Sequence, residues 1–352
     1  MDVTNPCGIF NTSYEKDAAI FRTGEHWAWL VFCLAFFFCA PLFLSNTLIS
    51  ILDLILISII CVLGINTATG YCGQLNIGQS AFMAVGAFVS GWLANDFALS
   101  FWITLPLSIL AGGLVASVFG LPSLRVKGLY LALFTLAAQF IIMWSFRRIP
   151  FFGGAYGLHL DELTLASWDL SGSKGFYHII LISTIICIYC DSNISRTKIG
   201  RAFVAIRDND LAAETLGINV KAYKFFAFFI SGCYAGFAGC LWANFVLFVG
   251  VEQFTLLDSV WFLGMAIVGG LGSTLGVILG VFFMKTLEQL TVSWVCPSLL
   301  EAFPSVAGET FAGFSLLVYS LVIIAFLVFE PRGLWHRWQV LKSAYRLHPF
   351  SN

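Results

Sequence analysis

Long apolar runs separated by short polar connections recur along this 352-residue chain. A helix that crosses the hydrocarbon core of a bilayer needs about 20 mostly apolar residues. Ten stretches are candidate spans, with rough bounds of 27–45, 47–66, 77–95, 99–120, 128–146, 176–190, 225–248, 254–270, 274–293 and 311–329. Every backbone polar group inside a bilayer needs an internal partner, so the runs must be helices or closed-barrel strands. They are continuously apolar rather than alternating. The sequence therefore predicts an all-α, polytopic transmembrane helical bundle of about ten spans.

Composition supports the membrane interpretation and excludes several classes of function. Only 11% of the residues are charged, against about 25% in an ordinary soluble domain. The net charge of −1 and the lack of a basic, aromatic-rich patch give no reason to expect nucleic acid as a partner. Most of the ten cysteines lie inside apolar runs, where cysteine behaves as a small hydrophobe. We therefore expect no disulfide framework, metal site, cofactor or catalytic constellation.

The distribution of charge predicts how the chain crosses the membrane. Cytoplasmic loops carry an excess of Lys and Arg near the ends of spans. With ten spans and the N-terminus inside, 14 of the 18 basic residues lie on the cytoplasmic side. We therefore predict a cytoplasmic N-terminal segment at 1–26, a transmembrane domain at 27–330 with a cytoplasmic loop at 191–224, and a cytoplasmic basic tail at 331–352.

The basic loop has an internal pattern of its own. Helix-favouring residues run between Gly200 and Gly217. Asp208 and Asp210 are placed to cap or complement a second short helix that begins near Asn209. Gly217 suits the left-handed end of that helix. The pattern predicts two short helices that form a compact projection; the alternative is a solvated loop without a partner.

Residues 206–219 read IRDNDLAAETLGIN. This stretch resembles the cytoplasmic loop of bacterial ABC importer permeases, whose short helix enters a groove of an ATPase subunit. The general motif is Glu-Ala-Ala, three residues and Gly; here Leu211 replaces the glutamate, which leaves the contact of that motif position unassigned. An IRDN-x-x-AAE-x-x-GIN pattern is typical of the branched-chain amino acid permeases. The resemblance implies a set of ATPase-docking residues: Arg201, Arg207, Asp208, Asn209, Ala212, Ala213, Glu214 and Gly217.

A glycine-rich stretch at 70–82 reads GYCGQLNIGQSAF. Part of it approaches a phosphate-binding P-loop, but Gln79 stands where the lysine is needed, so nucleotide binding is not expected. It resembles instead the GYAGQ-x-S-x-GHAAF signature of the same permeases, with Asn76 for serine and Gln79 for histidine. Broken backbone at membrane depth is tolerated only where protein or a water-filled cavity surrounds it. We predict that the stretch lines or gates a pathway; the alternative is tight helix packing through Gly73, Gly78 and Gly86.

Three more stretches carry the resemblance. They are GLYLAL at 128–133 with Gln139 after it, FGGAYGL at 152–158, where Phe152 replaces threonine, and VGGLGSTLG at 268–276. In order and spacing the resemblance covers about residues 60–335, and the family is the LivM-type permease of branched-chain amino acid ABC importers. The predicted translocation-pathway residues are Gly73, Gln74, Asn76, Gln79, Gln139 and Gly272.

The resemblance implies a permease subunit of the bacterial inner membrane without an ATPase site of its own. Its implied partners are two ABC ATPase subunits, a second homologous permease and a periplasmic substrate-binding protein. Branched-chain amino acids are the first choice of substrate; urea, short amides and aromatic acids are alternatives. An ion-coupled secondary transporter is a further alternative, although it predicts more intramembrane carboxylates than Asp53 and Glu288.

The roles of three charged residues within predicted spans stay open. Lys285 and Glu288 are three residues apart and are predicted to form a structural ion pair on one helix face; the alternative is a contact with the substrate. Asp53 lies either near a span end, where it reaches water, or at a functional position.

Overall fold

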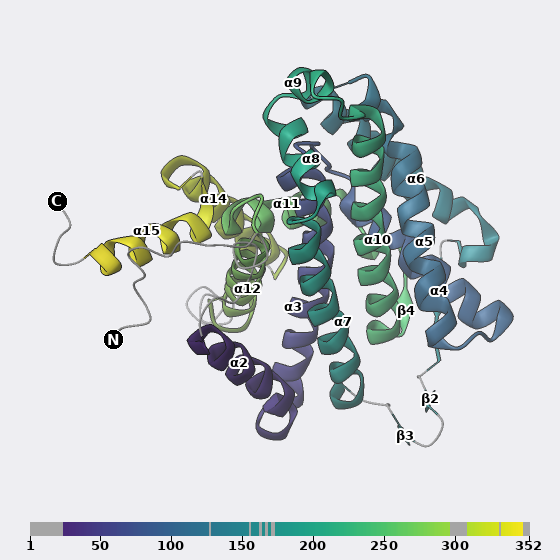
Figure 1. The fold of residues 1–352 in the computed structure, drawn as a ribbon. Helices are drawn as coiled ribbons and strands as arrows, with labels where there is room; N and C mark the ends of the chain where they lie inside the picture. Colours follow the sequence, from purple (N-terminus) through teal and green to yellow (C-terminus); the bar gives the residue numbers. More distant parts are fainter. Residues whose placement is uncertain are drawn as a thin grey trace.

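Helices make up most of the described chain, which in this computed structural model comprises residues 24–126, 128–154, 156–161, 164–165, 168–169, 173–295, 308–330 and 332–347 (Figure 1). The long helices are α2 (Gly24–Phe43), α3 (Asn46–Ile65), α4 (Gln79–Phe97), α5 (Phe101–Gly120), α6 (Leu129–Arg148), α7 (Ser173–Ile194), α10 (Val220–Val246), α11 (Leu256–Gly269), α12 (Thr274–Leu290), α14 (Gly308–Phe329) and α15 (Gly333–Leu347). Two short helices, α8 (Lys198–Asp208) and α9 (Asp210–Thr215), lie between α7 and α10.

The remaining elements are short. A π-helix, η1 (Asn66–Tyr71), continues α3, and a second, η5 (Thr291–Val295), continues α12. Three 3-10 helices are η2 (Leu121–Leu124), η3 (Pro150–Phe152) and η4 (Val251–Gln253). Strand β1 (Leu158–His159) pairs antiparallel with β4 (Phe248–Val249), and β2 (Thr164–Leu165) pairs with β3 (Trp168–Asp169).

The predicted polytopic helical architecture is confirmed. Among the described residues, seven helical stretches are long and apolar enough to span a membrane, and the bent pair Leu316–Phe329 and Gly333–Lys342 allows an eighth. All ten predicted ranges fall on helices, but α2 and α4 are not among the seven. Polar residues at both ends of α4, such as Gln79 and Asp96, lower its hydropathy. Because α4 packs against α10 and α5 in the interior, it can be less apolar than a lipid-facing helix.

The centre of the bundle is built around α10, which packs on α3, α4 and α5. Small residues allow these helices to approach closely. A Cβ on Gly239 would overlap the carbonyl oxygen of Met83 in α4, and a Cβ on Gly112 of α5 would lie 2.6 Å from the carbonyl oxygen of Gly232. Of the three glycines predicted to pack helices, Gly86 lies against the backbone of Gly236 in α10.

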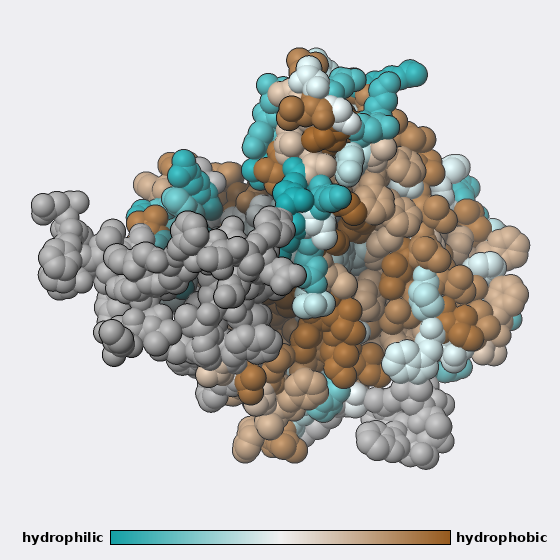
Figure 2. Space-filling model, viewed as in Figure 1, coloured by the Kyte–Doolittle hydropathy of each residue, from teal (hydrophilic) through white to brown (hydrophobic). Residues whose placement is uncertain are grey.

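The two ends of the bundle differ in polarity and in the hydrogen bonds that join the loops to the helices. At the end of α10 that lies away from α8 and α9, Leu160 donates its N–H to the carbonyl oxygen of Leu247 at 2.9 Å, next to the β1–β4 pair. The Asn95 side-chain amide donates to the carbonyl oxygen of His159 at 2.8 Å. At the other end, hydrophilic residues gather over α8 and α9, while hydrophobic residues cover the visible flank of the bundle (Figure 2).

Candidate functional site

The two short helices α8 and α9 form a projection at one end of the long helices (Figure 1). Asn209 separates them, and its side-chain oxygen accepts the N–H groups of Leu211 and Ala212, each at 3.1 Å. Gly217 ends the projection with φ +83°. The predicted helix pair and its glycine end are confirmed. The cap is Asn209 rather than an aspartate, because Asp210 occupies the first helical turn.

Most of the predicted docking residues are exposed on the projection. Arg201, Arg207, Asp208, Asn209, Ala212, Glu214 and Gly217 are exposed. Leu211 and Leu216 are also exposed there, at 69% and 79%, and Figure 2 shows hydrophobic residues among the hydrophilic ones at this end. Ala213 is 1% exposed and packs in a small core with Cys72 and Phe203. The structure thus places Ala213 on the inward face of α9.

Arg207 joins the projection to both glycine-rich stretches. Its Nη1 donates to the carbonyl oxygen of Gly70 at 2.9 Å. A Cβ on Gly73 would lie 2.9 Å from the Cγ of Arg207, and one on Gly272 would lie 3.1 Å from its Nη1. These two glycines, predicted as pathway residues, therefore make room for a docking-loop arginine. Both stretches and the projection meet at one end of the bundle.

A second link runs from α9 to α10. Lys224 Nζ lies 3.4 Å from Asp210 Oδ2, and the Lys224 side chain is only 4% exposed. Since a buried ammonium group needs an anionic partner, this pair fixes α9 against the membrane domain. The neighbouring Cys72 is buried, and burial raises the pKa of its thiol to about 12, although Lys224 acts in the opposite direction. The thiol is therefore protonated and unreactive at neutral pH.

Sequence reasoning missed a buried carboxylate beneath the projection. Asp191, near the end of α7, is fully buried. It accepts hydrogen bonds from the hydroxyls of Thr274 at 2.7 Å, Tyr71 at 3.0 Å and Thr67 at 3.4 Å. Asp191 thus connects α7 to η1 and to the start of α12. The signal that could have found it is an aspartate at the end of an apolar run.

The broken stretch between η1 and α4 is buried in protein, as its backbone requires. Asn76 Nδ2 donates to Gln79 Oε1 at 2.8 Å, and Gln79 Nε2 donates to the carbonyl oxygen of Cys61 at 3.0 Å. The Ser231 hydroxyl of α10 donates to the same Gln79 oxygen at 3.1 Å. The Gln74 amide donates to the Cys72 carbonyl oxygen at 3.3 Å.

Gln139 of α6 belongs to the same polar interior. Its Oε1 accepts the N–H of Ala81 at 2.8 Å and the hydroxyl of Ser259 at 3.1 Å, and its Nε2 donates to the carbonyl oxygen of Phe254 at 3.0 Å. Four predicted pathway side chains, Gln74, Asn76, Gln79 and Gln139, are buried and hydrogen-bonded within this chain. Gln79 and Gln139 join separate helices, whereas Gln74 and Asn76 bond only to residues close in sequence.

The charged positions left open by the sequence are now placed. Lys285 Nζ and Glu288 Oε2 lie 2.9 Å apart, so the predicted ion pair is confirmed. Asp53 is fully buried on α3 and does not reach water, and its two oxygens have no hydrogen-bond partner among the described residues. The described residues contain no group of His, Cys, Asp and Glu that could hold a metal ion.

These features define the class of protein: a multi-pass helical membrane protein with a polar two-helix projection. Buried links tie that projection to a broken helix in the core of the bundle. The chain belongs to the family of the branched-chain amino acid transport system permease component, whose model matches residues 47–327. The predicted family is thereby confirmed.

Individual relatives agree with this assignment. The chain is 28% identical to the high-affinity branched-chain amino acid transport system permease protein LivM of Escherichia coli K12, over 84% of this chain and 71% of the relative. It is 27% identical to the autoinducer 2 import system permease protein LsrC of Shigella flexneri, over 76% and 70%. It is 26% identical to the probable branched-chain amino acid transport permease protein LivH of Methanocaldococcus jannaschii, over 76% and 85%. No solved structure matches the chain significantly.

Proposed function

We propose that this chain is the membrane-spanning permease subunit of an ATP-driven importer for branched-chain amino acids. It works in the bacterial inner membrane with about ten spans and both termini in the cytoplasm. It has no ATPase site of its own. Its partners are two ABC ATPase subunits, a second homologous permease and a periplasmic substrate-binding protein.

The observation that carries the proposal is the exposed apolar surface on the α8–α9 projection. Leu211 and Leu216 are exposed at a polar end of the molecule. Exposed apolar residues with a polar rim are typical of a protein–protein contact. Glu214 and Asp208 supply that rim. An ATPase groove that receives this helix explains why leucine suits the position where the general motif has glutamate.

Two links are available to carry motion from the projection into the membrane domain. The Arg207–Gly70 hydrogen bond leads to η1, and the Asp210–Lys224 ion pair leads to α10. A displacement of α8 and α9 by the ATPase would therefore act on η1, which precedes the broken stretch, and on α10, whose Ser231 bonds to Gln79 at the end of that stretch. Asn76 and Gln79 lie at the far end of that stretch. We propose that their hydrogen bonds rearrange when the pathway opens, which exposes them together with Gln74 and Gln139.

The substrate class rests on the relatives and on the family. LivM and LivH relatives carry branched-chain amino acid transport in their names, which favours that class. The LsrC relative belongs to an autoinducer 2 import system, so a small polar molecule of another kind is the second candidate. Urea, short amides and aromatic acids belong to the same group of alternatives. An ion-coupled transporter would leave the projection without a purpose.

The test uses the chain reconstituted with its second permease, ATPase and binding protein in proteoliposomes. Wild type is expected to take up leucine only when ATP is present on the ATPase side. Leu216→Asp is expected to lower ATPase co-purification by about tenfold or more, because a buried anchor contributes 2 kcal/mol or more to an interface. Tyr156→Ser, which changes an exposed loop residue at the opposite end of the bundle, is the matched control and should bind the ATPase as wild type does.

Uptake driven by an ion gradient without ATP would overturn the proposal. Normal ATPase binding by Leu216→Asp would remove the docking assignment but not the transport activity. Thermal unfolding of each variant in detergent shows whether the membrane domain is intact.

A further inference from the structure

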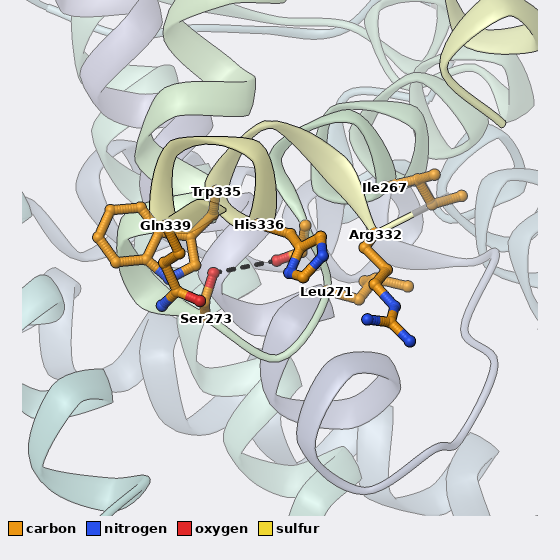
Figure 3. Close-up of a pocket in the computed structure, with 8 residues that line it drawn as sticks. Ile267, Leu271, Ser273, Arg332, Trp335, His336 and Gln339 are labelled. Carbon is orange, nitrogen blue, oxygen red and sulfur yellow. Dashed lines mark hydrogen bonds between the residues drawn. The ribbon is translucent and has the colours of Figure 1, made fainter. Parts of the chain in front are cut away.

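A cavity of about 350 Å³ lies between the α11–α12 loop and the first turns of α15 (Figure 3). Gly270 and Ser273 form its wall on the loop side, and Arg332, Trp335, His336 and Gln339 form it on the α15 side. Figure 3 shows His336 beside the hydrogen bond from Ser273 to the Gly270 carbonyl oxygen, with Arg332 beyond Leu271. The volume falls in the range of small-ligand pockets.

The wall of this cavity favours an anion. A guanidinium, an imidazole, a side-chain amide and a hydroxyl face it, and none of the described residues that line it is acidic. Arg332 has no ion-pair partner among the described residues. Glu330, the acidic residue nearest to it in sequence, pairs instead with Arg337. An arginine in a partly enclosed site, with hydrogen-bond donors around it, matches the oxygen atoms of a phosphate group.

The helix that forms one wall has the features of an interfacial helix. It is bent by 49° from Leu316–Phe329, the apolar helix before it, and Figure 1 shows it lying across the direction of α3 and α7. Trp338 and Leu341 are exposed on it, and so are Arg337 and Lys342. Short helices with apolar and basic residues lie in the headgroup region of membranes, where tryptophan is also enriched. On an interfacial α15, the mouth of the cavity would lie at the depth of lipid phosphates.

We propose that this cavity binds the phosphate of an anionic phospholipid of the leaflet on the α15 side. Arg332 holds the phosphate, with His336 and Gln339 as further hydrogen-bonding groups. The exposed Trp338 and Leu341 next to the site contact the acyl chains, which favours a phospholipid over free phosphate. Anionic lipids are attracted to basic sites of this kind at the membrane surface.

The loop that lines the cavity through Gly270, Leu271 and Ser273 also reaches the junction under the projection, through Gly272. The Gly272 N–H donates to Asn66 Oδ1 at 2.8 Å, and Gly272 lies against Arg207. A headgroup seated against Gly270 and Ser273 therefore holds the same short loop that contacts η1 and Arg207. Under the proposed function, the bound lipid fixes the loop through which ATPase motion reaches the core.

The experiment measures lipid retained by the purified chain in detergent by native mass spectrometry, with no ATPase or substrate present. Delipidated wild type is titrated with phosphatidylglycerol and, separately, with phosphatidylcholine. Wild type is expected to prefer phosphatidylglycerol. Arg332→Gln is expected to weaken phosphatidylglycerol binding by about fivefold or more, from the loss of one basic contact. Arg332→Lys should retain most of it.

Two further variants distinguish lipid binding in the cavity from general attraction to basic residues and from loss of the fold. Lys342→Gln removes a charge from the same helix outside the cavity and should change binding by less than about twofold. Gln339→Trp keeps every charge and fills the mouth of the cavity, so it should lower binding as Arg332→Gln does. Equal retention of the two lipids, wild-type binding by Arg332→Gln and Gln339→Trp, or full displacement of lipid by excess inorganic phosphate would each overturn the proposal. None of these outcomes bears on whether the chain transports amino acids.

Discussion

Lys224 is a basic residue whose position in the structure differs from the one that the sequence suggests. The sequence places it among several basic residues of an inner loop, and a basic residue in such a loop is expected to face water. The structure buries it beneath the projection, 3.4 Å from Asp210. Its charge therefore stabilises the position of α9 rather than only the orientation of the chain in the membrane.

Replacing one residue of this ion pair should lower the free energy of unfolding more than replacing both. Asp210→Ala leaves a buried ammonium group without its anionic partner, and we expect a loss of about 3 kcal/mol or more of unfolding free energy. Asp210→Ala combined with Lys224→Met removes both charges and should recover most of that loss. Thermal unfolding in detergent measures the difference. A double variant as unstable as Asp210→Ala would show that the ion pair is not the cause.

At the scale of elements, the close crossing of α4 and α10 fixes the centre of the bundle. Gly239 of α10 lies against the carbonyl oxygen of Met83 with no room for a methyl group between them. Close helix crossings of this kind depend on small residues in membrane proteins. A shift of either helix would also pull on the hydrogen bonds between Ser231 and Gln79.

Gly239→Ala should therefore destabilise the protein by about 1–3 kcal/mol, the usual cost of overpacking. Gly313→Ala is the matched control, since a Cβ at that position of α14 meets no atom within 4 Å. It should leave the melting temperature unchanged or raise it slightly, because alanine favours a helix interior over glycine by about 0.5–1 kcal/mol. Equal effects of the two substitutions would contradict the assigned crossing.

Elements were easier to predict than contacts, and the reasons are physical. Long apolar runs and the glycines that end short helices act locally, so the helices and the paired α8 and α9 follow from the sequence. Asp191, in contrast, gains its role from hydroxyls on η1 and α12 that are more than 80 residues away. The inward turn of Ala213 is likewise set by packing on Cys72 and Phe203, which no local pattern encodes.

For the whole molecule, the projection and the loop around Tyr156 should lie on opposite sides of the membrane. A cysteine introduced at Leu211 should react with a membrane-impermeant maleimide only when the cytoplasmic side is accessible, and one at Tyr156 only from the other side. The substitutions are made in a background in which the native cysteines, including the exposed Cys39 and Cys190, are replaced by serine, so that only the introduced thiol reacts. Labelling of both positions from the same side would exclude the proposed topology of ten spans with both termini in the cytoplasm.

The β1–β4 pair has a consequence for the path of the chain between its two strands. Leu160 and Leu247 are joined by a backbone hydrogen bond, so the 86 residues between them leave one point of the molecule and return to it. This segment runs through α7 to the projection and returns through α10, so the projection lies at its far end. A displacement of the projection is therefore transmitted along α10, whose other end lies about 40 Å away, as its length indicates, and is joined through Leu247 to Leu160. We expect the end of α10 at Leu247 to stay in place when the projection moves, and the end next to the projection to move further.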